Sequence, residues 1–316
     1  MVSPNIVSPT VKFPWLRLLK PRLKPRLKPS TGPLTLERQL IKIRDLPLQL
    51  RGLRIIQLSD FHFDGIGLSP RQLQQAIALA NAQSPDLICL TGDYVTDDPQ
   101  PVHHLAPALK QLRSTYGTYA VLGNHDLGQR GSRQVITEAL TQAGVRVLWN
   151  EIVYPFRSKP DGNAVTRPDQ TQPDQTQPDF ALVGLADMRS RSFLPATVFA
   201  ALGPAIPRLV LSHNPDSAEI LQQWRVDLQL SGHSHGGQIC LPGGEPVLGL
   251  LAPWVEQLPW RFKRRLRSLT RIVQHWEWAA GLHEVGDNLL YVNRGLGTYL
   301  PGRLFCPPEV TLITLA

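Results

Sequence analysis

Short apolar runs alternate with amphipathic segments along the chain from residue 53 onward. A short apolar run that ends in polar residues predicts a buried strand, and apolar residues at helical spacing predict a helix. Strands are expected at 53–59, 86–92, 118–123, 145–150, 180–185, 208–213, 226–233, 238–242, 288–293 and 310–315. Helices are expected at 69–83, 103–114, 132–144 and 215–224. This alternation predicts an α/β fold with mostly parallel central strands, and the strand-rich second half favours one domain with two sheets.

Two segments lack this periodicity. Residues 1–50 contain the repeat LKPRLKPRLKPS, in which regularly spaced prolines prevent a regular helix. Residues 158–179 contain PDQTQPDQTQPD, which has no large apolar residue and predicts a flexible surface insertion. The folded domain is therefore expected to span 51–316, after a tail that is either disordered or bound to an anionic membrane surface.

The positive charge of the chain lies mostly in that tail. The formal net charge is +8, and seven basic residues before Glu37, with no acidic residue among them, leave only +1 for the rest. A nearly neutral body without a nucleic-acid-reading motif argues against nucleic-acid binding. No protein partner is predicted either.

The cysteines and the apolar stretches indicate the compartment. Cys89, Cys240 and Cys306 are far apart, predict no disulfide framework, and suit a reducing environment. Cys89 and Cys240 lie in apolar runs and are expected to be buried. No apolar stretch reaches the roughly 18 residues of a membrane-spanning helix, and the first residues do not have the order expected of a secretory signal. We expect a cytoplasmic protein, with peripheral attachment to the inner face of the membrane as the alternative.

Side chains that can bind metals or protons follow five of the expected strands. They are Asp60, His62, Asp93, Asn124, His125, Asp126, His213, His233 and His235. Ligands of open α/β sheets bind beyond the carboxyl ends of the strands, so these side chains are expected to converge on one edge. Any one of them alone is more often a structural residue or part of a turn. Their joint occurrence after buried strands argues for a site.

The residue types in this set point to metal binding. Oxygen and nitrogen donors without a cysteine suit Mn²⁺, Fe or Zn²⁺ better than a soft metal. Seven candidates are too many for one ion and about right for two divalent ions that share a bridging carboxylate. The seven candidates are Asp60, His62, Asp93, Asn124, His213, His233 and His235.

The order of these motifs resembles that of the calcineurin-like metallophosphoesterases, from about residue 53 to the C-terminus. The motifs are D-x-H (Asp60, His62), G-D (Asp93), G-N-H-D (Asn124 to Asp126), a single His213 and G-H-x-H (His233, His235). The stretches GHSHGGQ and NRGLGTYLPGRLFCPPEVTLITL resemble a bacterial phosphodiesterase branch, often membrane-associated, that includes enzymes resembling UDP-2,3-diacylglucosamine pyrophosphatases. The resemblance implies two mixed β-sheets packed as a sandwich between helices, in four αββα layers.

The resemblance also implies a role for each residue. One metal ion would be held by Asp60, His62 and His235, the other by Asn124, His213 and His233, and Asp93 would bridge them. His125 would be the catalytic histidine outside the metal shell, oriented by Asp126. The implied reaction is a two-metal-dependent hydrolysis of a phosphodiester or diphosphate, in which a bridging hydroxide attacks phosphorus in line.

Residues 250–281 combine basic residues with tryptophans. Six basic residues fall within 261–271, and four tryptophans lie between 254 and 278. The segment is either a solvated amphipathic helix or a cap for an anionic amphiphile. The candidate substrate contacts are Trp260, Arg261, Lys263, Arg264 and Arg265.

A lipid-linked phosphoester such as UDP-2,3-diacylglucosamine is the leading substrate class on this interpretation. One alternative is a soluble phosphoesterase that acts on nucleotides or phosphoproteins. Another is a non-catalytic metal-binding scaffold, against which the complete ligand set argues. Gly236 and Gly237, directly after the histidine pair, are expected to form a tight turn before the strand at 238–242.

Overall fold

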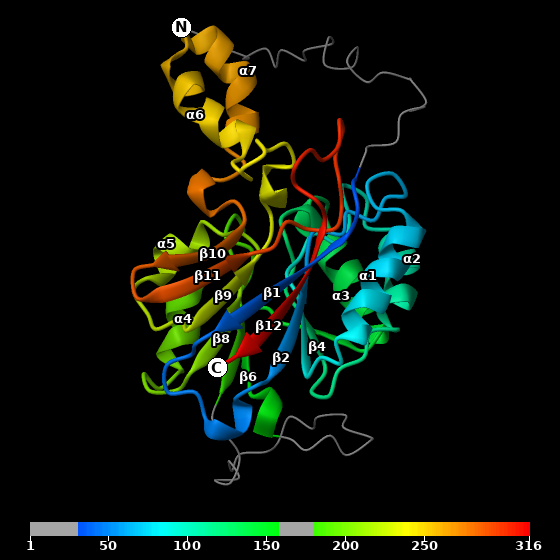
Figure 1. Cartoon of the computed structure of the whole chain (residues 1–316), viewed down its shortest axis with the longest axis vertical. Helices are drawn as coiled ribbons and strands as arrows, with labels where there is room; N and C mark the ends of the chain where they lie inside the picture. Colours follow the sequence, from blue (N-terminus) through cyan, green and yellow to red (C-terminus); the bar gives the residue numbers. More distant parts are fainter. Residues whose placement is uncertain (1–30, 158–179) are drawn as a thin grey trace, which may run out of the picture.

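The structure is a computed structural model that describes residues 31–157 and 180–316. Two six-stranded sheets pack face to face, with helices on their outer faces (Figure 1). The predicted sandwich of two mixed sheets flanked by helices is confirmed. The predicted insertion at 158–179, and the part of the predicted tail before residue 31, lie outside the described residues.

The first sheet has the strand order β1-β12-β2-β3-β4-β5. Its strands are β1 (Thr35–Ile41), β12 (Glu309–Leu315), β2 (Arg54–Leu58), β3 (Leu87–Leu90), β4 (Thr118–Ala120) and β5 (Val145–Val147). The strands from β2 to β5 are parallel, β12 is antiparallel to β2, and β1 is parallel to β12. The loops after β2, β3 and β4 therefore meet at one edge of the sheet.

The second sheet has the order β10-β11-β9-β8-β7-β6. Its strands are β10 (Gly281–Val285), β11 (Asn288–Val292), β9 (Leu228–Ser231), β8 (Arg208–Leu211), β7 (Ala181–Gly184) and β6 (Glu151–Val153). The four central strands are parallel, and the outer strands β10 and β6 run antiparallel to their neighbours. The loops after β7, β8 and β9 consequently share an edge as well.

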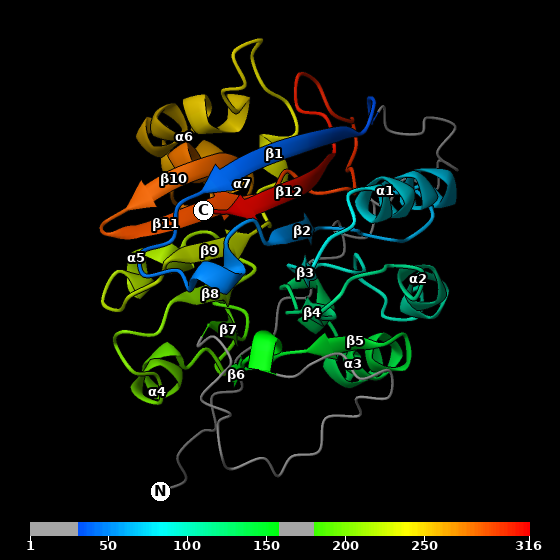
Figure 2. The ribbon, with the colours of Figure 1, turned by 60° about the horizontal axis from the view of Figure 1, so that its bottom comes forward.

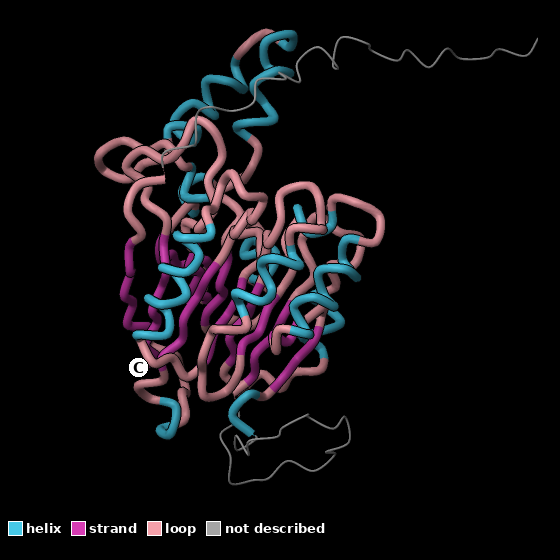
Figure 3. Tube along the Cα trace, turned by 90° about the vertical axis from the view of Figure 1, so that its right-hand side faces the viewer, coloured by secondary structure: helices cyan, strands magenta, loops and turns pink. Residues whose placement is uncertain are grey.

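Helices cover both sheets, which gives the four layers visible in Figure 2. The first sheet carries α1 (Pro70–Ala82), α2 (Val102–Leu109) and α3 (Ser132–Gln142), and the second carries α4 (Pro195–Ala200) and α5 (Ser217–Leu221). Short 3-10 turns lie at η2 (Leu48–Leu50), η3 (His125–Leu127), η4 (Pro155–Arg157), η5 (His235–Gly237) and η6 (Trp276–Trp278). Two more helices, α6 (Val247–Gln257) and α7 (Trp260–Thr270), stand clear of the sandwich (Figures 1 and 3). We call residues 247–270 the α6–α7 hairpin.

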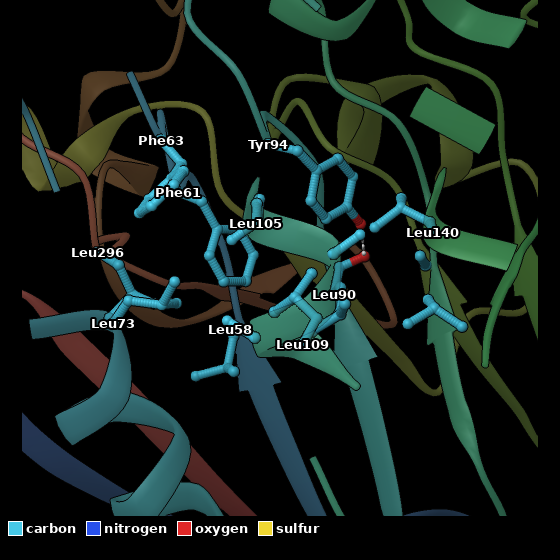
Figure 4. Packing of buried hydrophobic residues seen from close by; sticks show 14 of the residues in the cluster. Leu58, Phe61, Phe63, Leu73, Leu90, Tyr94, Leu105, Leu109, Leu140 and Leu296 are labelled. Atoms are coloured by element: carbon cyan, nitrogen blue, oxygen red, sulfur yellow. Dashed lines mark hydrogen bonds between the residues drawn. The ribbon is translucent and has the colours of Figure 1, made fainter. Parts of the chain in front are cut away.

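The core follows from the alternation of side chains along buried strands. In β2, Ile55 packs between the two sheets, whereas Ile56 packs against the helices. On the helix side, Leu58 and Leu90 share a cluster with Leu73 of α1 (Figure 4). Because both faces of the central strands are covered, their sequences are continuously apolar rather than alternating.

The predicted helices are all present, and every predicted strand except one is present. The exception is 238–242, where Ile239 and Cys240 form only single bridges to Leu304 and Pro246. Positive φ angles of 61° at Gly236 and 78° at Gly237 form the expected tight turn, and φ is positive again at the next residue. The chain therefore leaves this turn as an irregular loop.

The predicted start of the folded domain at residue 51 is wrong. The strand β1, Thr35–Ile41, pairs along its whole length with β12 and forms the edge of the first sheet. Edge strands have one solvated side, so the polar sequence TLERQLI does not have the apolar pattern of a buried strand. The folded part of the chain thus includes part of the predicted tail.

Arg294, in the loop after β11, fastens β1 to the rest of the sheet. Its guanidinium lies 2.5 Å from the carboxylate of Glu37 and 2.9 Å from the buried carboxylate of Glu309. Glu309 also accepts a hydrogen bond from the hydroxyl of Tyr291 at 2.6 Å. A buried carboxylate is stable only while it keeps such partners.

Replacing Arg294 with methionine should destabilise the protein by about 3–5 kcal/mol, because Glu309 would stay buried without its cation. The free energy of unfolding, measured by urea unfolding with circular dichroism, checks this. Arg38→Met removes an exposed cation from the same strand and should cost about 1 kcal/mol or less. Equal losses in the two variants would contradict the importance of the buried pair.

Candidate metal centre

Three overlapping groups of potential metal ligands lie at the edge where the parallel strands end. One of them contains His62, Asp93 and His125, and we call the other two, which share no residue, the two clusters. One cluster contains Asp60, His62 and His235, and the other contains Asp93, His213 and His233. Within each cluster the potential ligand atoms lie within 4.8 Å of one another, and all six residues are buried. The structure therefore brings together side chains from the loops after β2, β3, β8 and β9, as the sequence analysis expected.

Ring nitrogens face each other within both clusters. The Nε2 atoms of His62 and His235 are 3.1 Å apart, and His235 Nε2 lies 3.6 Å from Oδ1 of Asp60. In the second cluster, His213 Nε2 and His233 Nδ1 are 3.2 Å apart. Two nitrogen lone pairs at this distance need a proton or a cation between them. The geometry is thus suited to a positive ion in each cluster.

The carboxylate of Asp93 lies between the two clusters. Its Oδ2 atom is 3.1 Å from Nε2 of His213 and 3.5 Å from Nε2 of His62. Its Oδ1 atom accepts the backbone N–H of His125 at 2.9 Å. One oxygen of Asp93 therefore faces a candidate ligand of each ion, which is the position expected of a bridging carboxylate.

The outward nitrogens of three histidines are hydrogen-bonded to oxygen atoms. The pairs are His62 Nδ1 with the Tyr299 hydroxyl at 2.8 Å, His213 Nδ1 with the Thr91 carbonyl at 2.7 Å, and His233 Nε2 with the Ile272 carbonyl at 2.9 Å. A carbonyl oxygen can only accept, so His213 and His233 carry their lone pairs on the inner nitrogens when their rings are neutral. Metal-binding histidines are commonly oriented in this way.

Asn124, after β4, supports the metal interpretation. Its Oδ1 atom is buried and has no hydrogen-bond donor within the described part of the chain. An unpaired buried oxygen costs roughly 1–3 kcal/mol, and a divalent cation would satisfy it. With the carboxylates and imidazoles, this oxygen completes a donor set that fits Mn²⁺, Fe or Zn²⁺.

His125 is held by a backbone carbonyl. Its Nδ1 atom lies 2.6 Å from the carbonyl oxygen of Thr96, so Nδ1 carries a proton. Its Nε2 atom faces the hydroxyl of Tyr299 at 3.5 Å. The ring is also 4.9 Å from the ring of His62, measured between centroids. Nε2 is consequently the atom of His125 that can exchange a proton at the centre.

The side chain of Asp126 has a different role from the predicted one. Its carboxylate accepts the backbone N–H groups of Asp93 at 2.9 Å, Tyr94 at 2.8 Å and Gly123 at 2.8 Å. The prediction that Asp126 orients the ring of His125 is therefore wrong. Asp126 instead joins the loop after β3 to the loop after β4, and so positions the carboxylate of Asp93.

Buried aromatic residues anchor two of the ligand loops. Phe61 lies between Asp60 and His62 in the sequence, and Tyr94 directly follows Asp93. The two rings are stacked with centroids 5.6 Å apart, in the core beneath the centre (Figure 4). Burying these apolar neighbours holds the polar residues beside them at the edge of the sheet.

The ligand loops have strained backbones. Five candidate ligands have φ between 41° and 71°, namely Asp60, His62, Asp93, His233 and His235. Such conformations cost roughly 1–3 kcal/mol each and persist only where the surrounding structure fixes them. The backbone of Gly123 also lies very close to the carboxylate of Asp93, because a Cβ on Gly123 would lie 2.1 Å from Oδ1 of Asp93. The strain lowers the stability of the folded state, and the same backbone conformations fix the positions of the ligands.

The ionisation of the second cluster follows from burial and from Asp93. Burial opposes a charge on His213, but the nearby carboxylate of Asp93 raises the pKa of His213 to about 10. Burial raises the pKa of Asp93, yet His213 and His62 together hold that pKa well below its usual value. Burial and then His213 lower the pKa of His233 to about 3. The centre thus favours a positive charge beside Asp93 and a neutral ring at His233.

Two residues of the C-terminal loop contribute to the centre without having been predicted. The hydroxyl of Tyr299 reaches both His62 and His125. Arg303 is buried and donates to the carbonyls of Gly297 at 2.6 Å and His235 at 3.3 Å, which braces the loop. Both lie in the stretch NRGLGTYLPGRLFCPPEVTLITL, but their contacts with His62, His125 and His235 join residues far apart in the sequence, so the stretch alone does not indicate their roles.

The predicted substrate contacts lie on α7, away from both ligand clusters. Trp260 is exposed, the guanidinium of Arg261 lies 5.1 Å from the ring centroid of Phe262, and Lys263 forms an ion pair with Glu256. The side chains of Arg264 and Arg265 lie outside the described part of the structure. A role for these residues in substrate binding stays a prediction.

Comparisons with known proteins agree with this geometry. Residues 53–237 match the calcineurin-like phosphoesterase family. Phosphodiesterase YaeI of Escherichia coli (strain K12) is 33% identical over 267 residues, which cover 83% of this chain and 82% of that protein. The uncharacterized metallophosphoesterase YkuE of Bacillus subtilis (strain 168) is 30% identical over 278 residues, 87% of this chain and 83% of that protein. UDP-2,3-diacylglucosamine pyrophosphatase LpxG of Chlamydia trachomatis is 30% identical over 295 residues, 84% of each chain.

Asp93→Asn should lower the affinity for Mn²⁺ by more than about 100-fold, because both ions would lose the shared negative charge. Equilibrium dialysis with elemental analysis measures the affinity and the number of ions bound. Asp97→Asn changes an exposed carboxylate in the same loop and should leave both unchanged. Tight binding of two ions by Asp93→Asn would exclude the bridging role.

Proposed function

The chain belongs to the calcineurin-like phosphoesterase family, and from this premise we propose that it hydrolyses a lipid-linked diphosphate or phosphodiester at an anionic membrane surface. Hydrolysis of phosphoester bonds is the chemistry of the family, and the candidate ligands match it. The proposal adds the lipid-linked substrate, of which UDP-2,3-diacylglucosamine is the leading example, and the membrane surface.

The candidate ligands divide between two ions. Asp60, His62 and His235 would hold one ion, Asn124, His213 and His233 the other, and Asp93 would contact both. Two divalent ions supply charge that polarises the phosphoryl group and makes water a better nucleophile near neutral pH. The protein supplies fixed ligand positions and a largely buried floor, in which electrostatic interactions are stronger than in water.

His125 is the residue best placed to move a proton. The Thr96 carbonyl fixes the proton on Nδ1, so Nε2 is free to hold a second proton and to donate it to the leaving oxygen. Tyr299, whose hydroxyl lies between His62 and His125, can orient the phosphoryl oxygens by hydrogen bonding. His125 lies in the loop that carries Asn124, and the loop of Tyr299 contacts His62.

The observation that carries the lipid part of the proposal is the apolar surface of the α6–α7 hairpin. Trp254, Trp260 and Phe262 are 70%, 74% and 52% exposed, and Leu250 and Leu251 are exposed beside Trp254 on α6. Soluble proteins rarely leave such large apolar side chains together in solvent without a partner. Tryptophan, leucine and arginine side by side suit the boundary between lipid headgroups and acyl chains.

The relatives are consistent with such a substrate. Two of them are named UDP-2,3-diacylglucosamine pyrophosphatase LpxG, at 30% and 27% identity. Among residues 31–157 and 180–316, no helix has the length and hydropathy needed to span a bilayer. A surface contact through the α6–α7 hairpin requires no such span.

With Mn²⁺ added, the protein should hydrolyse UDP-2,3-diacylglucosamine with a kcat/KM at least about tenfold above that for bis-p-nitrophenyl phosphate, because binding energy from the lipid is added to the same chemistry. His125→Ala should keep its metal content and lose about 10²- to 10⁴-fold in kcat. A higher rate on nucleotides or phosphopeptides would instead support the soluble phosphoesterase. Unchanged rates in His125→Ala would refute the proton-donor role.

Vesicles test the membrane part separately. The double variant Trp254→Ser and Trp260→Ser should bind vesicles of phosphatidylglycerol and phosphatidylcholine at least about tenfold more weakly than the wild type, since two large apolar side chains are lost. Co-sedimentation measures the binding. Leu48→Ser with Leu194→Ser removes exposed apolar residues outside the hairpin and should have no effect. Absence of vesicle binding by the wild type would overturn the membrane part alone.

A further inference from the structure

A cleft separates the α6–α7 hairpin from the body of the protein beside the metal centre. Its volume is about 910 Å³, within the range of small-molecule sites. Its lining includes Ala252 of α6, Val273 and Trp276, and also Asn214 and Arg189. Asn214 directly follows the candidate ligand His213 in the sequence, so one residue of the cleft wall belongs to a ligand loop.

Arg189 reaches the cleft from the loop after β7, the same edge of the sheet that supplies the histidine ligands. Its Nη2 atom donates to the carbonyl oxygen of Ile272 at 2.6 Å. The same oxygen accepts a hydrogen bond from Nε2 of His233 at 2.9 Å. A single carbonyl oxygen therefore separates the guanidinium from a candidate metal ligand.

The carboxylate closest to Arg189 in the sequence is that of Asp187, which accepts the backbone N–H of Arg189 at 2.9 Å. Burial raises the pKa of Asp187, and the charge of Arg189 helps to oppose this rise. Within the described part of the chain, Arg189 forms no ion pair with a carboxylate. The acidic groups that line the cleft have other partners: Asp216 accepts the backbone N–H groups of Gln274 and His275, Glu256 pairs with Lys263 and Arg271, and Glu277 pairs with His275. The positive charge of Arg189 is thus available to an anionic ligand.

The guanidinium also keeps donors for such a ligand. Arginine has five N–H donors in a planar fork, and among the described residues the guanidinium of Arg189 makes one hydrogen bond, to the carbonyl of Ile272. The side chain is exposed to the cleft. A planar fork with free donors matches a phosphate group, which it can bind through two oxygens.

We propose that Arg189 binds the second phosphate group of a diphosphate substrate while the first lies at the metal centre. The inference rests on the proposed function and deepens it, because a simple phosphodiester has no second phosphate to fill this position. Arg189 would then favour diphosphates over monophosphates. The apolar side of the cleft, at Ala252, Val273 and Trp276, would contact the group attached to that phosphate.

The experiment compares two nucleotides that differ by one phosphate group. Isothermal titration calorimetry in saturating Mn²⁺ measures binding of uridine monophosphate and of the non-hydrolysable methylene analogue of uridine diphosphate. The wild type should bind the diphosphate analogue at least about tenfold more tightly. Arg189→Gln, which keeps a donor for the Ile272 carbonyl, should weaken the diphosphate analogue by about 10- to 100-fold and leave the monophosphate unchanged.

Two further variants make the result specific. Arg191→Gln removes the same charge from an exposed arginine in the same loop that does not line the cleft, and should keep the wild-type preference. Arg189→Lys keeps the charge without the planar fork and should restore part of the preference. Metal content, measured in each variant, should not change.

Three results would overturn the inference. They are a preserved diphosphate preference in Arg189→Gln, equal weakening of both nucleotides in that variant, and no preference in the wild type. Hydrolysis of bis-p-nitrophenyl phosphate by the wild type is scored separately. If the wild type hydrolyses this substrate but shows no diphosphate preference, only the role of Arg189 is refuted. If the wild type hydrolyses no phosphoester, the proposed function is refuted, and the binding comparison still decides on the role of Arg189.

Discussion

The buried carboxylate of Asp93 requires positive charge beside it, and the residues around this carboxylate provide it. Taking a carboxylate out of water costs several kcal/mol unless cations or donors replace the water. Oδ1 of Asp93 receives a backbone N–H, and Oδ2 faces His62 and His213. The raised pKa of His213 reflects the same requirement. The strained loops and the amide contacts of Asp126 hold this carboxylate where two clusters of ligands can share it.

The base of the α6–α7 hairpin is fixed to this centre. The carbonyl oxygen of Ile272 accepts a hydrogen bond from Nε2 of His233. The carboxylate of Asp216 accepts the backbone N–H groups of Gln274 and His275. A shift of this segment would therefore disturb an outer contact of a candidate metal ligand. Because orientation contributes strongly to catalysis, a substrate held between the hairpin and the body would have its phosphate placed relative to the ligands. The apolar tryptophans on the hairpin would meanwhile contact a lipid.

Much of the centre could be predicted from the sequence, because parallel strands deliver the residues that follow them to one edge. That rule alone predicts that Asp60 and His213 lie at this edge, where the structure has them. The edge strand at 35–41 could not be found in this way, since its solvated side removes the apolar pattern. The role of Asp126 cannot be predicted from the sequence for another reason. An acidic residue beside His125 suggests an ion pair, whereas its actual partners are backbone amides, which no sequence pattern identifies.

The same reasoning explains why Arg189 does not stand out in the sequence. The dense basic run on α7 attracts notice, but Arg261 lies over Phe262 and Lys263 pairs with Glu256. The attraction between a phosphate and a cation falls with distance and is screened by water. In the proposed complex, a single arginine at the edge of the cleft would therefore contribute more to phosphate binding than several on an exposed helix. Arg189 follows β7, so the strand-end rule that located the metal ligands applies to it as well.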